Sequence, residues 1–302
     1  MAITEILPGL FFIERGYLNA NHFAYSAASP VLIDSGYIDS FDETKHLLSQ
    51  VGIQIQDVGR IITTHCHCDH IGGHHKIQKA SGCDIALHRL GKHFIDTRDY
   101  WSTWWKYYHQ KAAFFNGTHG LADNDTLTIG PYQFEVIHTP GHAADGIVLY
   151  HRKHSMLISS DTLWEHDMAV HTLRVEGSAA LYQTQKSLER LATLKVANVY
   201  PGHGSGFTDF KGALNRGLQR VKRFMSDRSL VGEDVLKKII VYNILMHRKI
   251  SVDAFYDMLM KTNWFPETVD LYFSGHYRKK YEETIDHLTA KGFVTTKDGS
   301  YT

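Results

Sequence analysis

Short apolar runs separated by turn residues make up most of the first two hundred residues of the chain. Residues 10–16 and 22–36 each contain such a run, and Pro30 and Gly36 bound the apolar centre of the second one. β-Branched and aromatic residues bounded by Pro and Gly are typical of strands. The two segments therefore predict neighbouring antiparallel strands near the amino terminus.

Helical spacing alternates with strand patterns along the next part of the chain. Apolar residues three or four apart predict helices, and compact or alternating apolar runs predict strands. Helices are expected at residues 42–51, 71–80 and 179–194. Strands are expected at residues 58–63, 84–88, 126–129, 132–138, 146–151, 155–159 and 197–200. Mixed strands with helices outside them predict an α/β fold, in which two packed sheets are covered by helices.

The pattern changes after Gly206, where strand signals nearly vanish. Helices are expected at residues 214–225, 235–246, 252–259 and 281–290. The last of them leads into a predicted hairpin whose turn is Asp298-Gly299, and helices that end in a small β-wing resemble a winged helix. We therefore predict two domains: residues 1–210, which form the α/β domain, and residues 211–302, a smaller helical and winged-helix-like domain.

Composition and charge narrow the class of protein further. Lys plus Arg and Asp plus Glu both number 32, so no overall field favours nucleic acid or an anionic membrane. The chain has no apolar run of membrane-spanning length and no secretory start. Its three cysteines, Cys66, Cys68 and Cys83, are too few and odd in number for a disulfide framework. We expect a soluble cytoplasmic protein, with no nucleic-acid or membrane partner.

Histidine is over-represented, with 21 residues, and several lie at the spacing of metal ligands. The segment from residue 64 to 73, THCHCDHIGG, begins where an apolar strand ends and continues into a predicted helix. On an extended segment His65 and His67 point the same way and can bind one ion, while Asp69 and His70 turn toward a second. Cys66 and Cys68 point the opposite way, so we expect them to pack rather than to bind metal.

Further candidate ligands each follow a predicted strand. His142 in HTPGH, Asp161 in SSDTLW and His203 in YPGHG all come just after strand ends. Loops at strand ends gather side chains over a rigid sheet, and a catalytic metal needs a third protein ligand beyond two histidines. The order of these motifs, with VLIDSG before them, resembles the metallo-β-lactamase superfamily over roughly residues 5–205.

This resemblance implies an αββα sandwich with two divalent metal ions at one edge of the sheets. The ligands of the first ion would be His65, His67 and His142. Those of the second would be Asp69, His70 and His203, with Asp161 between the ions. Zinc is the favoured metal, and a His/Asp set also accommodates iron or manganese. The aspartate between the ions indicates the glyoxalase II, lactonase and thioesterase side of the superfamily rather than the true β-lactamases.

Two ions lower the pKa of water and polarise a carbonyl, so we expect cleavage of an ester, thioester or lactone of a small acyl substrate through a metal-bridging hydroxide. Asp69 is the candidate for passing a proton to the leaving group. Candidate substrate contacts are Trp101, Trp104, Trp105, Tyr108, Trp164 and His171. Most of these lie in the aromatic stretch from residue 100 to 115, which is interpreted either as a buried amphipathic helix or as a lid over the site.

Other functions stay open at this point. A persulfide dioxygenase would hold a single iron ion, a superfamily nuclease would need a basic groove, and an effector-binding regulator would use the C-terminal module to contact DNA or a protein. We expect that module to cap the active site instead. The sequence leaves the oligomeric state undecided, with a homodimer among the options.

Overall fold

The computed structural model describes residues 2–302 and contains two β-sheets that face each other. In spatial order, the first sheet consists of β1 (Ile3–Leu7), β2 (Leu10–Ile13), β3 (His22–Tyr25), β4 (Val31–Ile33), β5 (Arg60–Thr63), β6 (Asp84–His88) and β7 (His119–Leu121). The second consists of β12 (Asn198–Pro201), β11 (Met156–Ser160), β10 (Ile147–His151), β9 (Tyr132–His138) and β8 (Thr126–Ile129).

The sheets are mixed, as the sequence pattern predicts. Strands β1 to β4 pair antiparallel, and β4 to β7 pair parallel. In the second sheet β8 to β11 pair antiparallel, and β12 joins β11 in parallel. Parallel strands buried on both faces are continuously apolar, and β5 carries Ile61 and Ile62 side by side, both fully buried. One faces the other sheet and one faces the outer helices, because neighbouring strand residues point to opposite sides.

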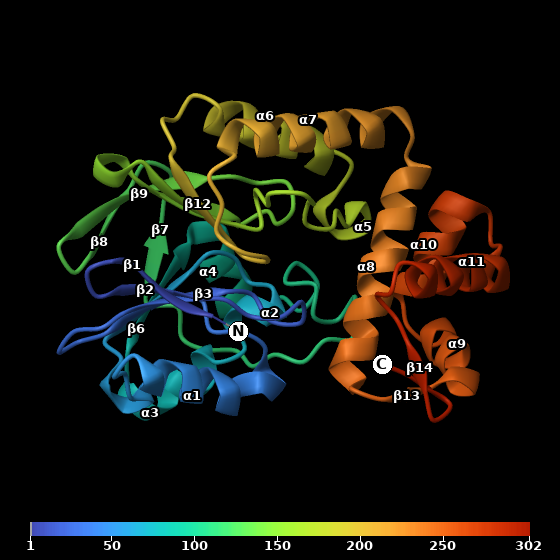
Figure 1. The fold of residues 1–302 in the computed structure, drawn as a ribbon, viewed down its shortest axis with the longest axis horizontal. Helices are drawn as coiled ribbons and strands as arrows, with labels where there is room; N and C mark the ends of the chain where they lie inside the picture. The colour runs from blue at the N-terminus through green and yellow to red at the C-terminus, as the bar shows by residue number, and fades with distance from the viewer. Residues whose placement is uncertain (1) are drawn as a thin grey trace.

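Helices cover both outer faces of the pair of sheets (Figure 1). On the first sheet lie α1 (Phe41–Gln50) and α3 (His74–Ser81), and α2 (Cys68–Ile71) and α4 (Arg89–Asp96) follow β5 and β6. On the second sheet lie α6 (Ala180–Leu191) and α7 (Phe210–Ser226), which pack against each other. The short α5 (Leu173–Glu176) precedes α6. The αββα sandwich predicted for this chain is confirmed.

The C-terminal part contains α8 (Ser229–His247), α9 (Val252–Met260), α10 (Trp264–Phe273) and α11 (Tyr277–Ala290). A small sheet joins β13 (Ile250–Ser251) to β15 (Ser300–Tyr301) and β15 to β14 (Thr296–Lys297). The turn of this hairpin has Asp298 at φ 50° and Gly299 at φ 68°, both in the left-handed region that a tight hairpin requires. The C-terminal part thus consists of helices followed by a small β-wing.

Helix α8 stands between the sandwich and the other C-terminal helices (Figure 1). One apolar core runs from Val148 and Leu157 of the second sheet through α7 to Val235 on α8, and on to Trp264 on α10. The two predicted domains therefore share packing, and their boundary at residue 210 falls where α7 begins. Within the described residues, none of the helices combines the length and the apolar composition needed to cross a bilayer.

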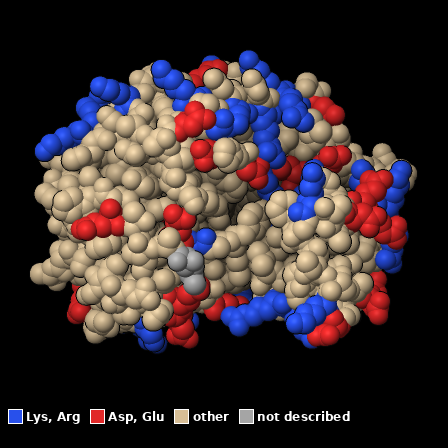
Figure 2. All heavy atoms as spheres, in the orientation of Figure 1, with Lys and Arg blue, Asp and Glu red and all other residues tan. Residues whose placement is uncertain are grey.

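Charge is unevenly spread on the face seen in Figure 2. Lys and Arg gather along the upper edge, where α6 and α7 lie in Figure 1, while acidic and basic side chains are mixed elsewhere. Helix α7 contributes five basic residues and no acidic one over residues 210–226. The same view shows a hollow between the sandwich and the C-terminal helices.

Candidate metal centre

The predicted motif lies at the carboxyl end of β5, where the chain leaves the first sheet. His65 and His67 lie in the extended segment before α2, and their ring centroids are 4.4 Å apart. Helix α2 then begins at Cys68 and carries Asp69 and His70 in its first turn. The helix forms at once because the backbone N–H groups of His70 and Ile71 both bond to the carbonyl of His67. This helical turn points Asp69 and His70 in a different direction from His65 and His67, as the sequence predicts.

Three later strand ends bring the remaining candidates to the same place. His142 follows β9, Asp161 follows β11 and His203 follows β12. The potential ligand atoms form three groups, each within 4.8 Å: His65 with His67 and His142; His65 with His70 and Asp161; and Asp69 with His70 and His203. All seven sequence-predicted residues are thus brought together, from segments up to 138 positions apart.

The chemistry of these donors fits divalent metal ions. Within residues 2–302, four ring nitrogens that face the cluster are buried without a hydrogen-bond partner: Nε2 of His65, His67, His70 and His142. A buried unpaired polar atom is costly unless something occupies it. Burial lowers the pKa of His65, His67 and His142, which keeps these imidazoles neutral with a lone pair available for a metal.

The charge of Asp161 is favoured by its neighbours. Burial by itself would raise the pKa of Asp161, but His70, His203 and His142 outweigh that effect and hold the pKa well below its usual range. Its Oδ2 lies 3.4 Å from His70 Nε2, 3.5 Å from His142 Nε2 and 3.8 Å from His203 Nε2. One carboxylate oxygen is therefore close to nitrogens of both predicted ligand sets.

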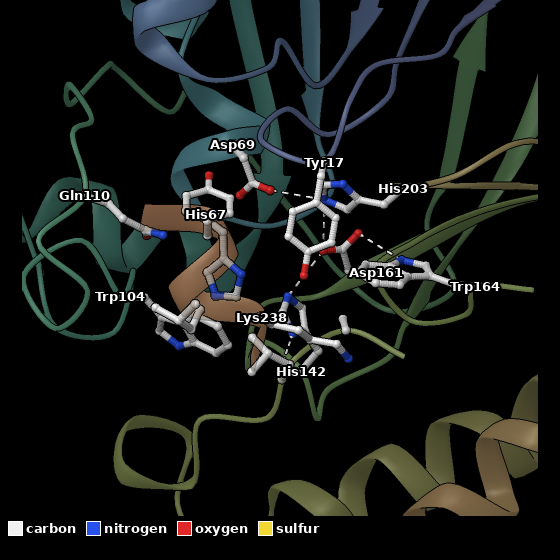
Figure 3. A pocket seen from close by; sticks show the side chains of 14 residues that line it. Tyr17, His67, Asp69, Trp104, Gln110, His142, Asp161, Trp164, His203 and Lys238 are labelled. Carbon is white, nitrogen blue, oxygen red and sulfur yellow. Dashed lines mark hydrogen bonds and ion pairs between the residues drawn. The ribbon is translucent and has the colours of Figure 1, made fainter. Parts of the chain in front are cut away.

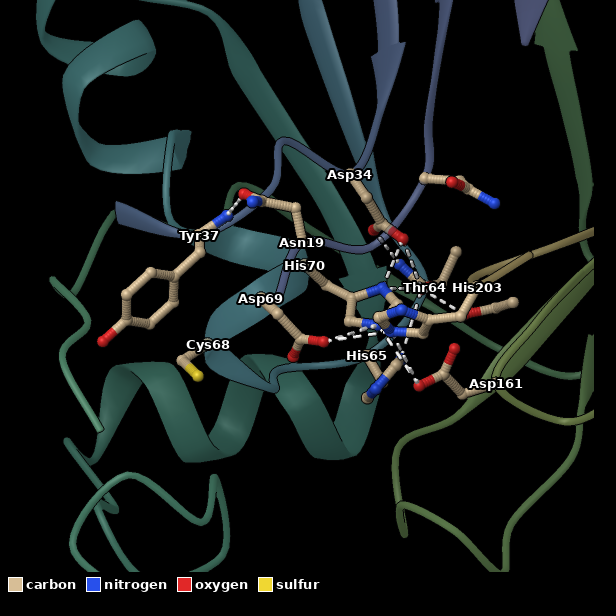
Figure 4. A network of polar contacts seen from close by, with 12 residues as sticks. Asn19, Asp34, Tyr37, Thr64, His65, Cys68, Asp69, His70, Asp161 and His203 are labelled. Atoms are coloured by element: carbon tan, nitrogen blue, oxygen red, sulfur yellow. Dashed lines mark hydrogen bonds and ion pairs between the residues drawn. The ribbon is translucent and has the colours of Figure 1, made fainter. Parts of the chain in front are cut away.

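Two hydrogen bonds orient the histidine rings. His70 Nδ1 lies 2.8 Å from Oδ2 of Asp34, whose carboxylate also accepts bonds from the backbone and hydroxyl of Thr64 (Figure 4). His142 Nδ1 lies 2.7 Å from the carbonyl oxygen of Val170. Both acceptors require an N–H on Nδ1, so Nε2 of each ring is left free to face the cluster. Sequence analysis missed these partners, although Asp34 lies in the VLIDSG segment that it singled out.

The turn that carries His203 is fixed by the segment between β2 and β3. Asn21, just before β3, donates from Nδ2 to the carbonyls of Pro201 at 3.0 Å and Gly204 at 2.7 Å. Gly202 packs against the carboxylate of Asp161, where an added Cβ would overlap Oδ1. His203 Nε2 then lies 3.1 Å from Oδ2 of Asp69. Gly202 of the YPGHG segment is thus required because its backbone closely approaches Asp161, the acidic residue between the two ligand groups.

A pocket of about 60 Å³ opens onto the cluster (Figure 3). Its walls combine aromatic and apolar side chains with the polar residues of the cluster, and they come from segments between residues 17 and 242: Tyr17, His67, Asp69, Trp104, Gln110, His142, Asp161, Trp164, Ala169, Val170, His203, Lys238, Ile239 and Tyr242. The last three lie on α8, so the C-terminal helix forms part of the wall. Sequence analysis did not single out Tyr17, Gln110, Lys238 or Tyr242, because no motif marks them.

The predicted substrate residues separate into two groups. Trp104 and Trp164 line the pocket, with ring centroids 3.8 Å from His67 and 5.1 Å from His203. The structure places the other four, Trp101, Trp105, Tyr108 and His171, outside its lining.

These four residues are held by packing and hydrogen bonds elsewhere. Trp105 donates from Nε1 to the carbonyl of Cys66 and is 2% exposed. Tyr108 bonds to Thr172, and His171 bonds to Thr184 on α6. Trp101 is partly buried against the large apolar core. Only part of the aromatic segment therefore faces the site.

The aromatic segment is also not the helix that its spacing suggested. Residues 101–109 form successive turns, and Trp104 and His109 have φ angles of 67° and 52°. A residue in the left-handed region interrupts an α-helix. The turns direct successive aromatic rings to different sides, so Trp104 faces the pocket while Trp105 faces the core of the first sheet.

Fold and cluster together define a metal-dependent hydrolase of the α/β class. The model of the metallo-beta-lactamase superfamily matches residues 25–203, which is more than half of the chain and includes all the candidate ligands. The chain belongs to this superfamily, whose fold implies binding of divalent metal.

Several relatives are similar over part of their length. The chain is 27% identical over 229 residues to a beta-lactamase-like protein 2 homolog from Drosophila melanogaster, covering 71% of each chain. It is 31% identical over 144 residues to a hydroxyacylglutathione hydrolase from Ectopseudomonas mendocina, covering 47% of this chain and 46% of the relative. It is 25% identical over 161 residues to the acyl-coenzyme A thioesterase MBLAC2 from Gallus gallus, covering 48% and 56%.

The fold has a full-length counterpart among solved structures. A metallo-beta-lactamase family protein from Thermus thermophilus matches with a TM-score of 0.61 and 20% identity, over 98% of this chain and 99% of that one. Because the match spans nearly the whole chain, it includes the C-terminal helices as well as the sandwich. The likeness concerns the fold alone.

Proposed function

We propose that the chain is a dinuclear metal-dependent hydrolase that cleaves a thioester, ester or lactone of a small acyl compound. The observation that carries the proposal is the position of Asp161, whose Oδ2 is within 3.8 Å of ring nitrogens from both ligand groups. A carboxylate between two dications offsets their repulsion, and this is the arrangement expected of a two-metal site. Zinc is the metal we propose for both positions.

The ligand assignment follows the geometry of the cluster. We assign His65, His67 and His142 to the first metal, because their ligand atoms form one group. Asp69, His70 and His203 form a second group and are assigned to the second metal, with Asp161 shared. When bound, the two ions would supply Lewis acidity for the carbonyl and lower the pKa of water toward neutrality.

The protein's own side chains would shape the pocket and exclude water from it. Trp104, Trp164 and Val170 give apolar walls that exclude bulk water from the acyl group, which strengthens the electrostatic interactions inside. Asp69 faces the pocket and lies within hydrogen-bond distance of His203. We propose Asp69 as the group that holds the proton passed to the leaving group.

A thioester is the favoured bond within this class. Two relatives are described as a hydroxyacylglutathione hydrolase and an acyl-coenzyme A thioesterase, and both names denote thioester cleavage. The pocket also has apolar side chains, Trp104, Trp164 and Val170, beside the cluster, which suits an acyl group. We propose a small-molecule acyl substrate and no nucleic-acid partner.

The test combines metal analysis with a substrate panel. Full-length protein loaded with zinc is assayed on matched acyl esters, thioesters and lactones, and metal per chain is measured by mass spectrometry. Two zinc ions and preferential thioester hydrolysis are expected. One iron ion per chain with persulfide oxidation would support the dioxygenase alternative instead. Absence of hydrolysis together with a shift of duplex DNA at low salt would support the regulator, for which the basic α7 is the relevant surface.

A further inference from the structure

Lys238 on α8 faces the pocket but has no free donor. Its Nζ lies 3.0 Å from Oδ2 of Asp234 and 3.2 Å from Oδ1 of Asp167, and it also donates to the carbonyl of Met168. An ammonium group has three N–H bonds, and these three acceptors use all of them. The side chain is 11% exposed. Lys238 is therefore built into the wall and is not available to bind an anionic group of a substrate.

The acceptors of Lys238 belong to two different parts of the chain. Asp234 lies one turn earlier on α8, whereas Asp167 and Met168 lie in the loop after β11. Arg220 of α7 completes the cluster, with 2.6 Å contacts to both Asp167 and Asp234. Two cations thus alternate with two carboxylates, so the charges balance. Partly buried ion pairs with this many hydrogen bonds hold their geometry far better than isolated surface pairs.

The loop held by this cluster leads directly to a predicted metal ligand. Two residues after Met168, the carbonyl of Val170 accepts the hydrogen bond from His142 Nδ1 at 2.7 Å. The next residue, His171, anchors the loop to α6 through Thr184. The carbonyl that orients His142 is therefore fixed from both sides, by α7 and α8 before it and by α6 after it. A shift of the loop would rotate or release the imidazole.

We propose that Lys238 is a positioning residue through which the C-terminal helix α8 sets the first metal site. It ties α8 to residues 167–168, so that Val170 holds His142 in the orientation that a metal ligand needs. This inference rests on the proposed function only in taking His142 as a ligand. It gives the C-terminal module a role in metal binding, in addition to forming one wall of the pocket.

The test compares Lys238→Met with Lys237→Met in the full-length protein. Lys237 is the adjacent residue, its contact is Glu233 at 3.6 Å on the same helix, and it lies outside the pocket lining. Metal-free protein is titrated with Co²⁺, and the absorption spectrum of the bound ion and its affinity are recorded for each site. Lys238→Met should weaken one of the two sites by about 10- to 100-fold and alter its spectrum, as loss of support for a ligating histidine does. Lys237→Met should match the wild type.

A second variant keeps the test decisive if Lys238→Met folds poorly. Asp167→Asn removes the carboxylate charge that the loop presents to Lys238 and Arg220, at a residue that is 44% exposed, and it should weaken the same site. Wild-type cobalt affinity and spectrum in both folded variants would overturn the proposal. A higher KM for anionic substrates alone, with metal binding unchanged, would show that Lys238 is a substrate contact. Because the readout is metal binding, failure of the wild type to hydrolyse any acyl substrate would count against the proposed function and not against this inference.

Discussion

The carboxylate of Asp161 lies among the imidazole rings of His70, His142 and His203. Its position follows from β11, which ends at Ser160 and delivers the carboxylate to the sheet edge. Close packing of Gly202 then leaves it little room to move. A group this confined suits the position between two ions that we propose for it.

In the dinuclear site that we propose, replacement of Asp161 by Asn should leave one metal ion per chain instead of two. The amide keeps the shape of the side chain but carries no charge to offset the repulsion between the ions. We expect the affinity of the weaker site to fall at least tenfold while the other is retained. Metal content after gel filtration measures this, with Asp286→Asn on the exposed side of α11 as control. Two ions at unchanged affinity would show that Asp161 is not shared.

Glu176 gives a pH dependence that can be measured separately from catalysis. Burial raises the pKa of Glu176 to about 8, with Asp145 adding to the effect, although the Trp104 indole at 2.6 Å opposes it. Between its ordinary value of 4.5 and about 8, the folded state keeps this proton and the unfolded state loses it. The contribution of Glu176 to stability should therefore fall as the pH rises through this window.

Glu176→Gln removes that pH dependence while keeping an oxygen that can accept the indole N–H. The melting temperature of the variant, minus that of the wild type, should increase from pH 5 to pH 8. Thermal denaturation at several pH values measures the difference. A difference that is constant with pH would mean that Glu176 is ionised in the folded protein throughout this range.

At the scale of elements, strand ends explain how far the sequence could predict the site. All seven candidate ligands follow an apolar run typical of a strand, and strand ends meet at one sheet edge, but the complete ligand set was predicted from the resemblance to the superfamily. Val170 could not be found in this way, because it contributes a backbone carbonyl and any residue supplies one. Lys238 was missed because its partners Asp167 and Asp234 lie on a loop and a helix whose contact depends on how α8 packs.

The aromatic segment, residues 100–115, shows what the sequence could not predict. Its spacing is compatible with a helix, but the left-handed residues Trp104 and His109 break it into turns. A single sequence does not reveal such backbone conformations for residues with bulky side chains. The expectation that the whole segment forms a lid therefore reduces to one ring, Trp104, on the pocket side.

Neighbouring indoles in this segment provide a matched pair of variants. Trp104→Ala should raise KM for apolar or aromatic acyl substrates selectively, because about 25 cal/mol is lost per Å² of apolar contact removed. Both rings are buried in apolar cores, so each variant should lose about 3–5 kcal/mol of stability, but Trp105→Ala should leave KM nearly unchanged because Trp105 lies outside the pocket lining. Michaelis kinetics and chemical denaturation are measured for both. Equal effects of the two variants on KM would rule out a pocket role specific to Trp104.

At the scale of the whole molecule, one apolar core crosses the predicted domain boundary. Its members include Leu157 in the second sheet, Val221 on α7, Ile239 on α8 and Trp264 on α10. The sequence predicted both parts, since the change from strands to helices after Gly206 is plain. It did not predict that they share a core, because apolar spacing shows which face of a helix is buried but not what buries it.

Deletion of residues 227–302 should therefore damage folding as well as substrate binding. This deletion keeps α7 but removes α8 with its pocket residues Ile239 and Tyr242. It also exposes the apolar residues of α7 and the second sheet that pack against the C-terminal helices. We expect aggregation, or a soluble form with a much lower melting temperature. Size-exclusion chromatography and thermal denaturation test this. A soluble truncated chain with wild-type kinetics would show that the C-terminal helices are an independent appendage.

The two tryptophans beside the cluster give the molecule its own optical reporter. The ring of Trp104 is 3.8 Å from His67, a predicted ligand of the first ion, and that of Trp164 is 5.1 Å from His203, a predicted ligand of the second. The fluorescence of an indole is sensitive to charge on a neighbouring ring. Binding of the first ion should therefore change the emission of Trp104, and binding of the second should change the emission of Trp164. Single replacement of either indole by Phe separates the two signals. The order in which the two positions fill can then be followed in unlabelled protein.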